Sequence, residues 1–113
     1  MMLHGLIVIN KPEGMTSHDV VAVLRRIFRM RRVGHFGTLD PMATGLLLAG
    51  LGQVTKFFDF YVGKKKTYTG EIRFGFSTDT YDKTGRPMAK PVPVNLEAVD
   101  LDALASRFTG EIL

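Results

Sequence analysis

Two apolar runs, one helical repeat and one long alternation divide the chain into predicted elements. Residues 5–10 and 45–51 are short and mostly aliphatic, and each predicts a buried strand. Between them, residues 18–30 carry apolar side chains at helical spacing, with arginines mostly on the other side, which predicts an amphipathic helix. Residues 65–76 place apolar and polar side chains at alternate positions. This alternation is the clearest prediction of a strand in the chain.

The segments between these elements are rich in Gly, Pro or polar residues. Residues 34–45 contain three glycines and one proline, which predicts a structured loop. Residues 53–61 have the spacing of a short helix, and residues 77–93 predict a long loop or hairpin insertion. Asp100 is placed to cap a last helix, and residues 109–113 resemble the start of another strand. Because domains seldom end at such a point, we expect the chain to be one piece of a longer protein.

Composition limits the class of protein. The chain has 113 residues, 45% hydrophobic and 23% charged, which is typical of one soluble domain or part of one. No apolar run approaches the roughly 18 to 20 residues that a membrane helix needs, and no signal peptide is evident. The absence of cysteine excludes disulfides and thiol catalysis. These features predict a cytoplasmic protein with no membrane contact.

Positive charge is concentrated in the first two thirds of the chain. Residues 1–75 hold 11 basic and 5 acidic residues, whereas residues 76–113 hold 4 basic and 6 acidic ones. Clustered guanidinium and ammonium groups favour a polyanion such as nucleic acid, although a solvated helix face would have the same composition. The candidate contacts to an RNA backbone are Arg29, Arg31, Arg32, Lys64, Lys65 and Lys66.

Asp40 is the candidate catalytic group. The three histidines lack the spacing of a metal site, and no P-loop or serine-hydrolase motif is present. Asp40 is the only carboxylate of the loop at residues 34–45, and we expect nearby arginines to keep it ionised. An ionised carboxylate serves as a nucleophile or a general base. The alternative is an ordinary Asp-Pro turn, in which Asp40 caps the amides of Ala43 or Thr44.

Four motifs in order resemble one family. Gly34-His35-Phe36-Gly37-Thr38-Leu39-Asp40-Pro41-Met42-Ala43-Thr44-Gly45 is similar to the catalytic motif of the TruB family, the tRNA pseudouridine-55 synthases. Lys11-Pro-x-Gly-x-Thr-Ser17, Lys66-x-Tyr68 and the segment from Ser77 to Gly85 resemble three further motifs of that family. Phe36 is a departure, because the family usually has a small residue there. It either wedges against RNA or packs under the loop.

The resemblance implies roles for individual residues. Asp40 matches the catalytic aspartate, and Tyr68 matches the tyrosine that stacks on the flipped uracil. His35 matches a histidine that contacts the flipped nucleotide, and Asp82 matches a residue that orients a distant arginine. The implied substrate is the T-arm stem-loop of tRNA. No metal, cofactor or obligatory protein partner is implied.

The resemblance also implies the fold. We expect an α/β protein of the α+β type, with the mixed, mostly antiparallel sheet of a pseudouridine synthase. Residues 1–113 would form the N-terminal portion of its catalytic domain, without the C-terminal remainder and RNA-binding domain. Two other functions fit the same motifs: a non-catalytic RNA-binding module, and the related synthase that needs a guide RNA and protein partners.

Overall fold

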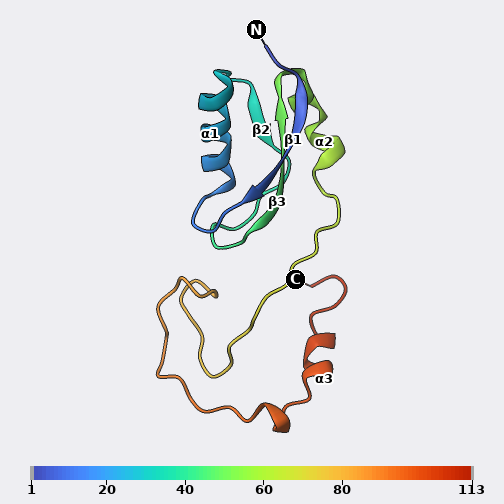
Figure 1. Ribbon diagram of the computed structural model, residues 1–113. Helices are drawn as coiled ribbons and strands as arrows, with labels where there is room; N and C mark the ends of the chain where they lie inside the picture. The colour runs from blue at the N-terminus through green and yellow to red at the C-terminus, as the bar shows by residue number, and fades with distance from the viewer. Residues whose placement is uncertain (1, 113) are drawn as a thin grey trace. The chain divides into compact units, whose positions relative to one another are not determined.

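The computed structural model describes residues 2–112, which form two compact units. The first unit comprises residues 2–68 and the second residues 69–112. The first contains a three-stranded antiparallel sheet of order β1-β3-β2, formed by β1 (Gly5–Lys11), β2 (Val33–His35) and β3 (Gly45–Leu51). Helix α1 (Ser17–Phe28) lies against one face of this sheet (Figure 1). The combination of helices and an antiparallel sheet confirms the predicted α+β class.

The core of the first unit lies between α1 and the sheet. Val20, Val21 and Leu24 of α1 are buried against Leu47 and Ala49 of β3. Side chains alternate between the two faces of a sheet along each strand. The residues next to Leu47 and Ala49 on β3, and every second residue of β1, therefore point to the face opposite α1. On that opposite face Leu6, Val8 and Leu46 remain exposed. The buried core cluster of the sheet therefore lies on the α1 side, and these three side chains of the other face remain uncovered.

Local side-chain chemistry sets the ends of α1. The hydroxyl of Thr16 accepts a hydrogen bond from the Asp19 amide, and the Asp19 carboxylate accepts one from the Thr16 amide. This capping box satisfies two amides that a helix start leaves unpaired. The last residue of the helix is Phe28, and Arg29 follows as its C-cap in a left-handed conformation, with a φ of 52°. The predicted helix at residues 18–30 is thus confirmed, with its C-terminal end two residues earlier.

Two predicted elements differ in detail. Residues 53–61 form a 3-10 helix η1 (Gly52–Phe57) followed by one short α-helix, α2 (Phe58–Tyr61). Strand β2 was not predicted, and it occupies the first two residues of the expected loop at 34–45. Three residues are too short for a recognisable alternation. Pairing with β3, as between His35 and Ala49, is what makes them a strand.

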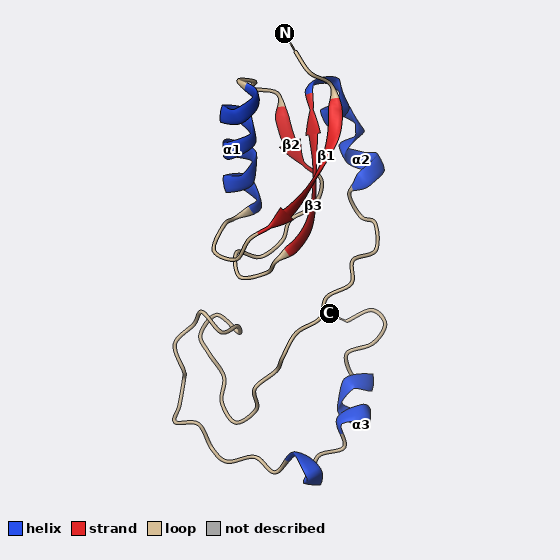
Figure 2. Cartoon of the chain, viewed as in Figure 1, coloured by secondary structure: helices blue, strands red, loops and turns tan. Residues whose placement is uncertain are grey.

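The second unit is mostly irregular (Figure 2). Its regular elements in the described part of the chain are η2 (Leu96–Ala98) and α3 (Leu101–Ser106), and Asp100 caps α3 as predicted. A single bridge between Thr78 and Pro87 closes a turn within the expected loop. Residues 109–112 form no strand, so that prediction is wrong for the described residues.

The strand expected at residues 65–76 is also wrong. These residues have no ladder partner, and the side chains of Tyr68 and Ile72 are 61% and 83% exposed. An alternating pattern reports which side chains share a face, but a strand also needs a neighbour for its backbone hydrogen bonds. The segment has the pattern without such a neighbour.

Candidate functional site

Asp40 lies on the surface, in the loop that joins β2 to β3. The Ala43 amide donates to the backbone carbonyl of Asp40 at 2.9 Å, with Pro41 second in the resulting turn. The turn is therefore closed by the backbone and not by the Asp40 side chain, which corrects the capping alternative. Within residues 2–112 the Asp40 carboxylate has no hydrogen-bond or ion-pair partner. It is consequently open to a ligand from solvent.

Leu39 anchors the loop on one side of Asp40. Its side chain is buried in the core, and its amide donates to the hydroxyl of Ser17 at 2.9 Å. The same hydroxyl donates to the carbonyl of Leu39 at 3.3 Å. Ser17, 2% exposed, thus satisfies both backbone groups of the residue before Asp40.

Pro41 anchors the loop on the other side. Its carbonyl accepts from the Gly14 amide at 2.8 Å and from the Lys11 ammonium at 3.2 Å. Lys11 is completely buried, and its other two hydrogen bonds go to the carbonyls of Pro12 at 2.9 Å and Met15 at 2.7 Å. The three donors of an ammonium group are thereby all satisfied. The loop that carries Asp40 is fixed to the preceding turn.

The sequence offered Ser17, with Thr16, as a helix-capping hydroxyl, but it gave neither Lys11 nor Ser17 a role in holding the Asp40 loop. Both belong to the motif that spans residues 11–17, so the signal was present. Neither the depth of burial of a lysine nor a contact 22 residues away along the chain can be read from that motif. The structure shows that the first motif holds the second one in place.

Lys66 contacts the Asp40 loop from a third direction. Its ammonium donates to the carbonyl of Thr38 at 3.0 Å. Gly37 has a φ of 110°, and a Cβ there would lie 2.9 Å from the Lys66 nitrogen. The left-handed backbone favours glycine at position 37, whereas the flexible end of Lys66 could shift to admit a Cβ.

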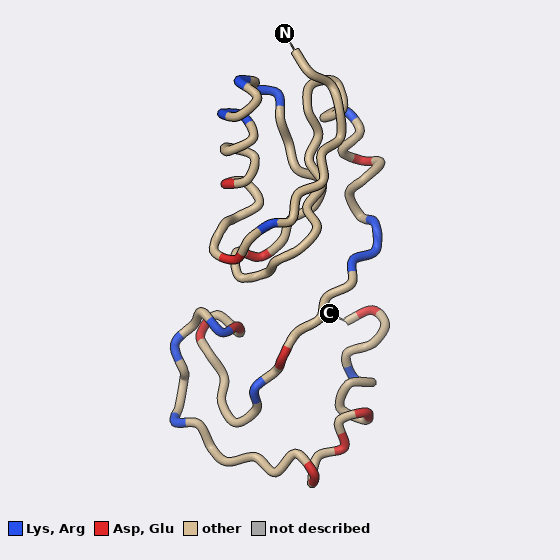
Figure 3. Tube along the Cα trace, viewed as in Figure 1, with Lys and Arg blue, Asp and Glu red and all other residues tan. Residues whose placement is uncertain are grey.

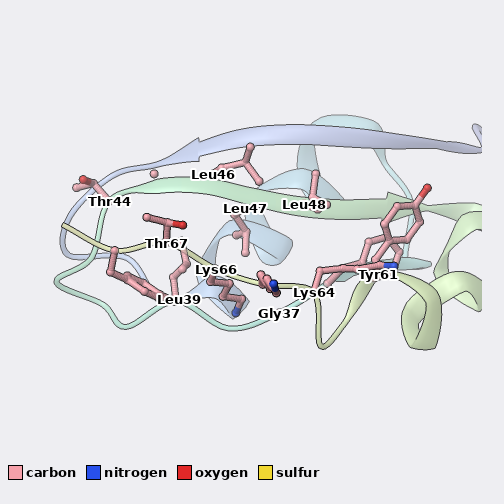
Figure 4. Close-up of a pocket in the computed structure, with 14 residues that line it drawn as sticks. Gly37, Leu39, Thr44, Leu46, Leu47, Leu48, Tyr61, Lys64, Lys66 and Thr67 are labelled. Carbon is pink, nitrogen blue, oxygen red and sulfur yellow. The ribbon is translucent and has the colours of Figure 1, made fainter. Parts of the chain in front are cut away.

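A cavity of about 320 Å³ opens beside this loop. In Figure 4 the side chains of Leu39 and Lys66 lie on one side of it and those of Leu47 and Leu48 on another. Tyr68 also lines this cavity, together with the whole stretch from Lys64 to Thr67. Asp40 and His35 are not among its lining residues. The structure thus brings Tyr68 to the flank of the loop, although not from the predicted strand.

His35 ends β2 and faces its own loop. It is half-buried and pairs with Ala49 of β3. Its Nδ1 atom lies 3.1 Å from the carbonyl of Gly37, a hydrogen bond in the tautomer that carries the proton on Nδ1. This contact orients the ring at the entrance to the loop.

Phe36 packs under the loop, which decides between its two predicted roles. The side chain is 6% exposed and stacks on Tyr61, with ring centroids 5.1 Å apart. Phe58 completes the group at 6.3 Å. A Cβ at position 50 would clash with the Phe36 ring, so Gly50 makes room for it. Phe36 is a packing residue in this fold.

The arginines lie at the other end of α1 from the Asp40 loop. Ser17 begins the helix beside Leu39, and Arg29 caps its other end twelve residues later, about 18 Å along the axis. Figure 3 shows their positions at the end of the unit opposite the loop. The expectation that arginines lie near Asp40 is therefore wrong. In the described residues, cations reach this loop through Lys11, which bonds the carbonyl of Pro41, and Lys66, which bonds the carbonyl of Thr38.

The basic side chains differ in how far they are already engaged. Arg32 donates through Nε to the Thr55 hydroxyl at 3.1 Å, and Arg25 donates to the carbonyl of Val33. Lys64 places its nitrogen 4.9 Å from the centre of the Phe60 ring, a cation–π contact. Arg29, Arg31 and Lys65 are exposed. They are the least engaged of the predicted RNA contacts.

Asp82 lies in the second unit, at the centre of a turn. Its carboxylate accepts hydrogen bonds from Thr80 and Thr84, which lower its pKa below the ordinary range. The carboxylate is thus held in the charged form by its own turn. Its predicted role in orienting an arginine stays a prediction.

Residues 2–112 contain no group of three or more His, Cys, Asp or Glu side chains arranged to hold a metal ion. None of their helices has the length and apolar character required to cross a bilayer.

Comparison with known proteins identifies the family. The model of the TruB family pseudouridylate synthase (N terminal domain) matches residues 25–113. A tRNA pseudouridine synthase B of Solibacter usitatus is 48% identical over 111 residues, which cover 98% of this chain and 38% of the relative. The proteins of the same name from Arthrobacter sp. (strain FB24) and Mycobacterium tuberculosis (strain ATCC 25618 / H37Rv) are 45% and 47% identical, over 98% and 96% of this chain and 36% of each relative.

The fold is that of a mixed α+β protein with an antiparallel sheet. Its site is an exposed carboxylate, Asp40, in a loop that buried residues hold in place. With the match over residues 25–113, the chain belongs to the TruB family of pseudouridylate synthases, and the predicted resemblance is confirmed. It spans a little over a third of the length of the curated relatives it matches.

Proposed function

We propose that this chain forms part of a tRNA pseudouridine synthase that isomerises uridine 55 of the T loop, with Asp40 as the nucleophile. The observation that carries the proposal is the Asp40 carboxylate, which has no partner within residues 2–112 although both neighbouring residues are tied to the turn at 11–17. A fixed nucleophile avoids the entropic cost of orientation during the reaction. The relatives named tRNA pseudouridine synthase B support the substrate and the reaction class.

The proposed reaction conserves all atoms of the substrate. The bond between N1 of uracil and C1′ of ribose breaks, the base turns, and a bond from C5 to C1′ replaces it. The hydrogen on C5 leaves as a proton, and one proton is taken up at N1. The Asp40 carboxylate attacks the ribose or the base, or acts as a base itself. These routes share the same requirement for an ionised and accessible Asp40.

The target base must leave its stack before this chemistry. Tyr68 is 61% exposed at the cavity beside the loop, which supports its role as the ring that stacks on the uracil. His35, held against Gly37, contacts the flipped nucleotide. In this proposal Phe36 takes no part in RNA contact, because its ring is buried.

Two separate basic groups hold the RNA backbone. Lys64, Lys65 and Lys66 line the cavity and bind phosphates near the target, whereas Arg29, Arg31 and Arg32 bind phosphates further along the substrate. Phosphate contacts position the RNA, and the splayed loop provides the specificity. The proposal further places the chain in a pseudouridine synthase fold and in the cytoplasm, where tRNA is modified, with no obligatory protein partner.

Tritium release tests the proposal directly. The purified chain is incubated with a T-arm stem-loop that carries 5-³H-uridine at position 55, without guide RNA or other protein. We expect release by the wild-type chain and none by Asp40→Asn, whose amide is not a nucleophile. A stem-loop labelled at a different uridine is the control for T-loop position.

Two further results would decide between the alternatives. Tight RNA binding without release from wild type or Asp40→Asn would contradict catalysis by this chain and favour a binding module. Release that appears only with added guide RNA would favour the guide-dependent synthase. Tyr68→Phe is expected to lose turnover more than affinity, and equal losses would assign Tyr68 to packing.

A further inference from the structure

The turn between Ser77 and Met88 is the most extensively hydrogen-bonded part of the second unit. The Met88 amide donates to the Ser77 carbonyl at 2.9 Å, and the Asp79 amide donates to the Arg86 carbonyl at 3.1 Å. The Arg86 amide donates in turn to the Asp79 carboxylate at 2.8 Å. These bonds close the base of the turn.

Asp82 fixes the tip of the same turn. Its Oδ1 atom accepts from the Thr80 hydroxyl at 2.8 Å and from both the amide and the hydroxyl of Thr84, at 2.8 and 2.6 Å. The backbone carbonyl of Asp82 accepts from the Thr78 hydroxyl at 2.7 Å. The residues on both sides of position 81 are therefore held in place.

Tyr81 occupies the point between these restraints. Its φ is 63°, a left-handed conformation that glycine, asparagine and aspartate adopt far more readily than a bulky aromatic residue. Its side chain is 93% exposed, so packing within the described chain does not compensate for the backbone strain. Strained residues that their surroundings enforce are concentrated at ligand-binding sites.

We propose that Tyr81 is a second stacking platform, which receives an unpaired base of the RNA substrate other than the target uridine. This inference rests on the proposed function, because that function supplies the RNA. Lys83 and Arg86 are exposed in the same turn and contribute positive charge to it. The carboxylates of Asp79 and Asp82 accept hydrogen bonds from the turn's own donors. An aromatic ring with flanking cations suits a base and its phosphate.

The rigidity of the turn explains why a strained tyrosine is useful there. The backbone of the turn is already fixed, so stacking of a base costs conformational entropy only in the Tyr81 side chain. The face of any base is a π-surface, so the platform selects an accessible unpaired base and not a particular sequence. Single-stranded loops of a folded RNA present such bases.

Two variants of the 113-residue chain test the proposal on the T-arm stem-loop. Tyr81→Asn removes the ring and suits the left-handed backbone, so the turn is retained; thermal unfolding checks this. We expect the Kd of Tyr81→Asn to rise about 5- to 100-fold, and that of Tyr81→Phe to remain within about twofold of wild type. Equal affinities of wild type and Tyr81→Asn would overturn the proposal, as would undetectable binding by the wild type.

A set of stem-loops, each with one abasic nucleotide in the loop, identifies the stacked base. At one loop position, loss of the base should raise the Kd of the wild-type complex and leave the Kd of the Tyr81→Asn complex unchanged. The effects of the two changes are then not additive, as expected for groups in contact. Additive losses at every position would overturn stacking. Tritium release on the parent stem-loop reports the proposed function separately. Tritium release without a non-additive effect at any loop position would contradict only the stacking role of Tyr81. A non-additive effect without tritium release would contradict only the proposed synthase activity.

Discussion

At the scale of single residues, Lys11 links the two motifs of the first unit. It is fully buried, and its ammonium donates to three carbonyls, one of which belongs to Pro41 beside Asp40. A buried acceptor that loses its donor costs about 1–3 kcal/mol. The contribution of Lys11 is therefore both to stability and to the position of the loop.

We expect Lys11→Met to lower the free energy of unfolding by about 2–4 kcal/mol, because the carbonyls lose their charged donor while the side-chain volume is kept. Urea unfolding followed by circular dichroism measures the change. Lys65→Met, at an exposed position, is the matched control and should shift the midpoint little. An unchanged midpoint for Lys11→Met would show that water replaces the ammonium.

At the scale of elements, the capping box makes the stability of α1 depend on pH. The amide of Thr16, followed by its hydroxyl, lowers the pKa of Asp19 below its usual range. A carboxyl group whose pKa is lower in the folded state stabilises the fold above its unfolded pKa. This contribution is lost as the pH falls through the folded value.

We therefore expect the unfolding temperature to decrease as the pH is lowered below about 4, and Asp19→Asn to show a smaller decrease. Thermal unfolding at a series of pH values between 7 and 3 measures both. Asp59→Asn is the control, because no side chain caps α2. Parallel curves for wild type and Asp19→Asn would contradict the role of the capping box.

The position of the arginines makes a separate prediction at this scale. Reversing the charge of Arg29 and Arg31 together should reduce the salt slope of T-arm binding, log Kd against log salt, by about 1.4–1.8 if each contacts one phosphate. Arg32 is left unchanged in this experiment, because its hydrogen bond to Thr55 also holds the fold.

A double variant of equal charge change, Lys90→Glu with Arg107→Glu, is the control for the arginine experiment, because it alters exposed positions of the second unit. Its salt slope should match that of the wild type. An unaltered slope in the Arg29 and Arg31 variant would mean that these two residues do not touch phosphate.

At the scale of the whole molecule, the segment around Lys64, Lys65 and Lys66 lies just before the boundary between the two units. These residues are exposed and irregular, and the units divide after Tyr68. We expect trypsin to cut first in this segment, and a bound T-arm to slow that cut, because the same lysines are proposed to bind phosphate. Mass spectrometry of the early fragments gives the site; an RNA-independent rate would contradict the proposed contact.

The sequence by itself determined the elements whose signals are local. Apolar runs predicted strands β1 and β3. The helical spacing of apolar residues, behind a hydroxyl that can cap a helix, predicted α1, and Asp100 predicted the start of α3. The motifs also named Asp40, and with it the family. Each of these features depends on residues within one turn or one strand.

Only the tertiary structure decided which distant groups meet. It showed that Lys11 and Ser17 hold the Asp40 loop and that Phe36 is a packing residue. It also showed that Arg29 lies at the other end of α1, about 18 Å along the axis from Ser17. It also left residues 65–76 without a partner strand. Burial and pairing join positions that are far apart in the chain. A pattern in the sequence records what a residue is suited to contact, and the fold decides what it does contact.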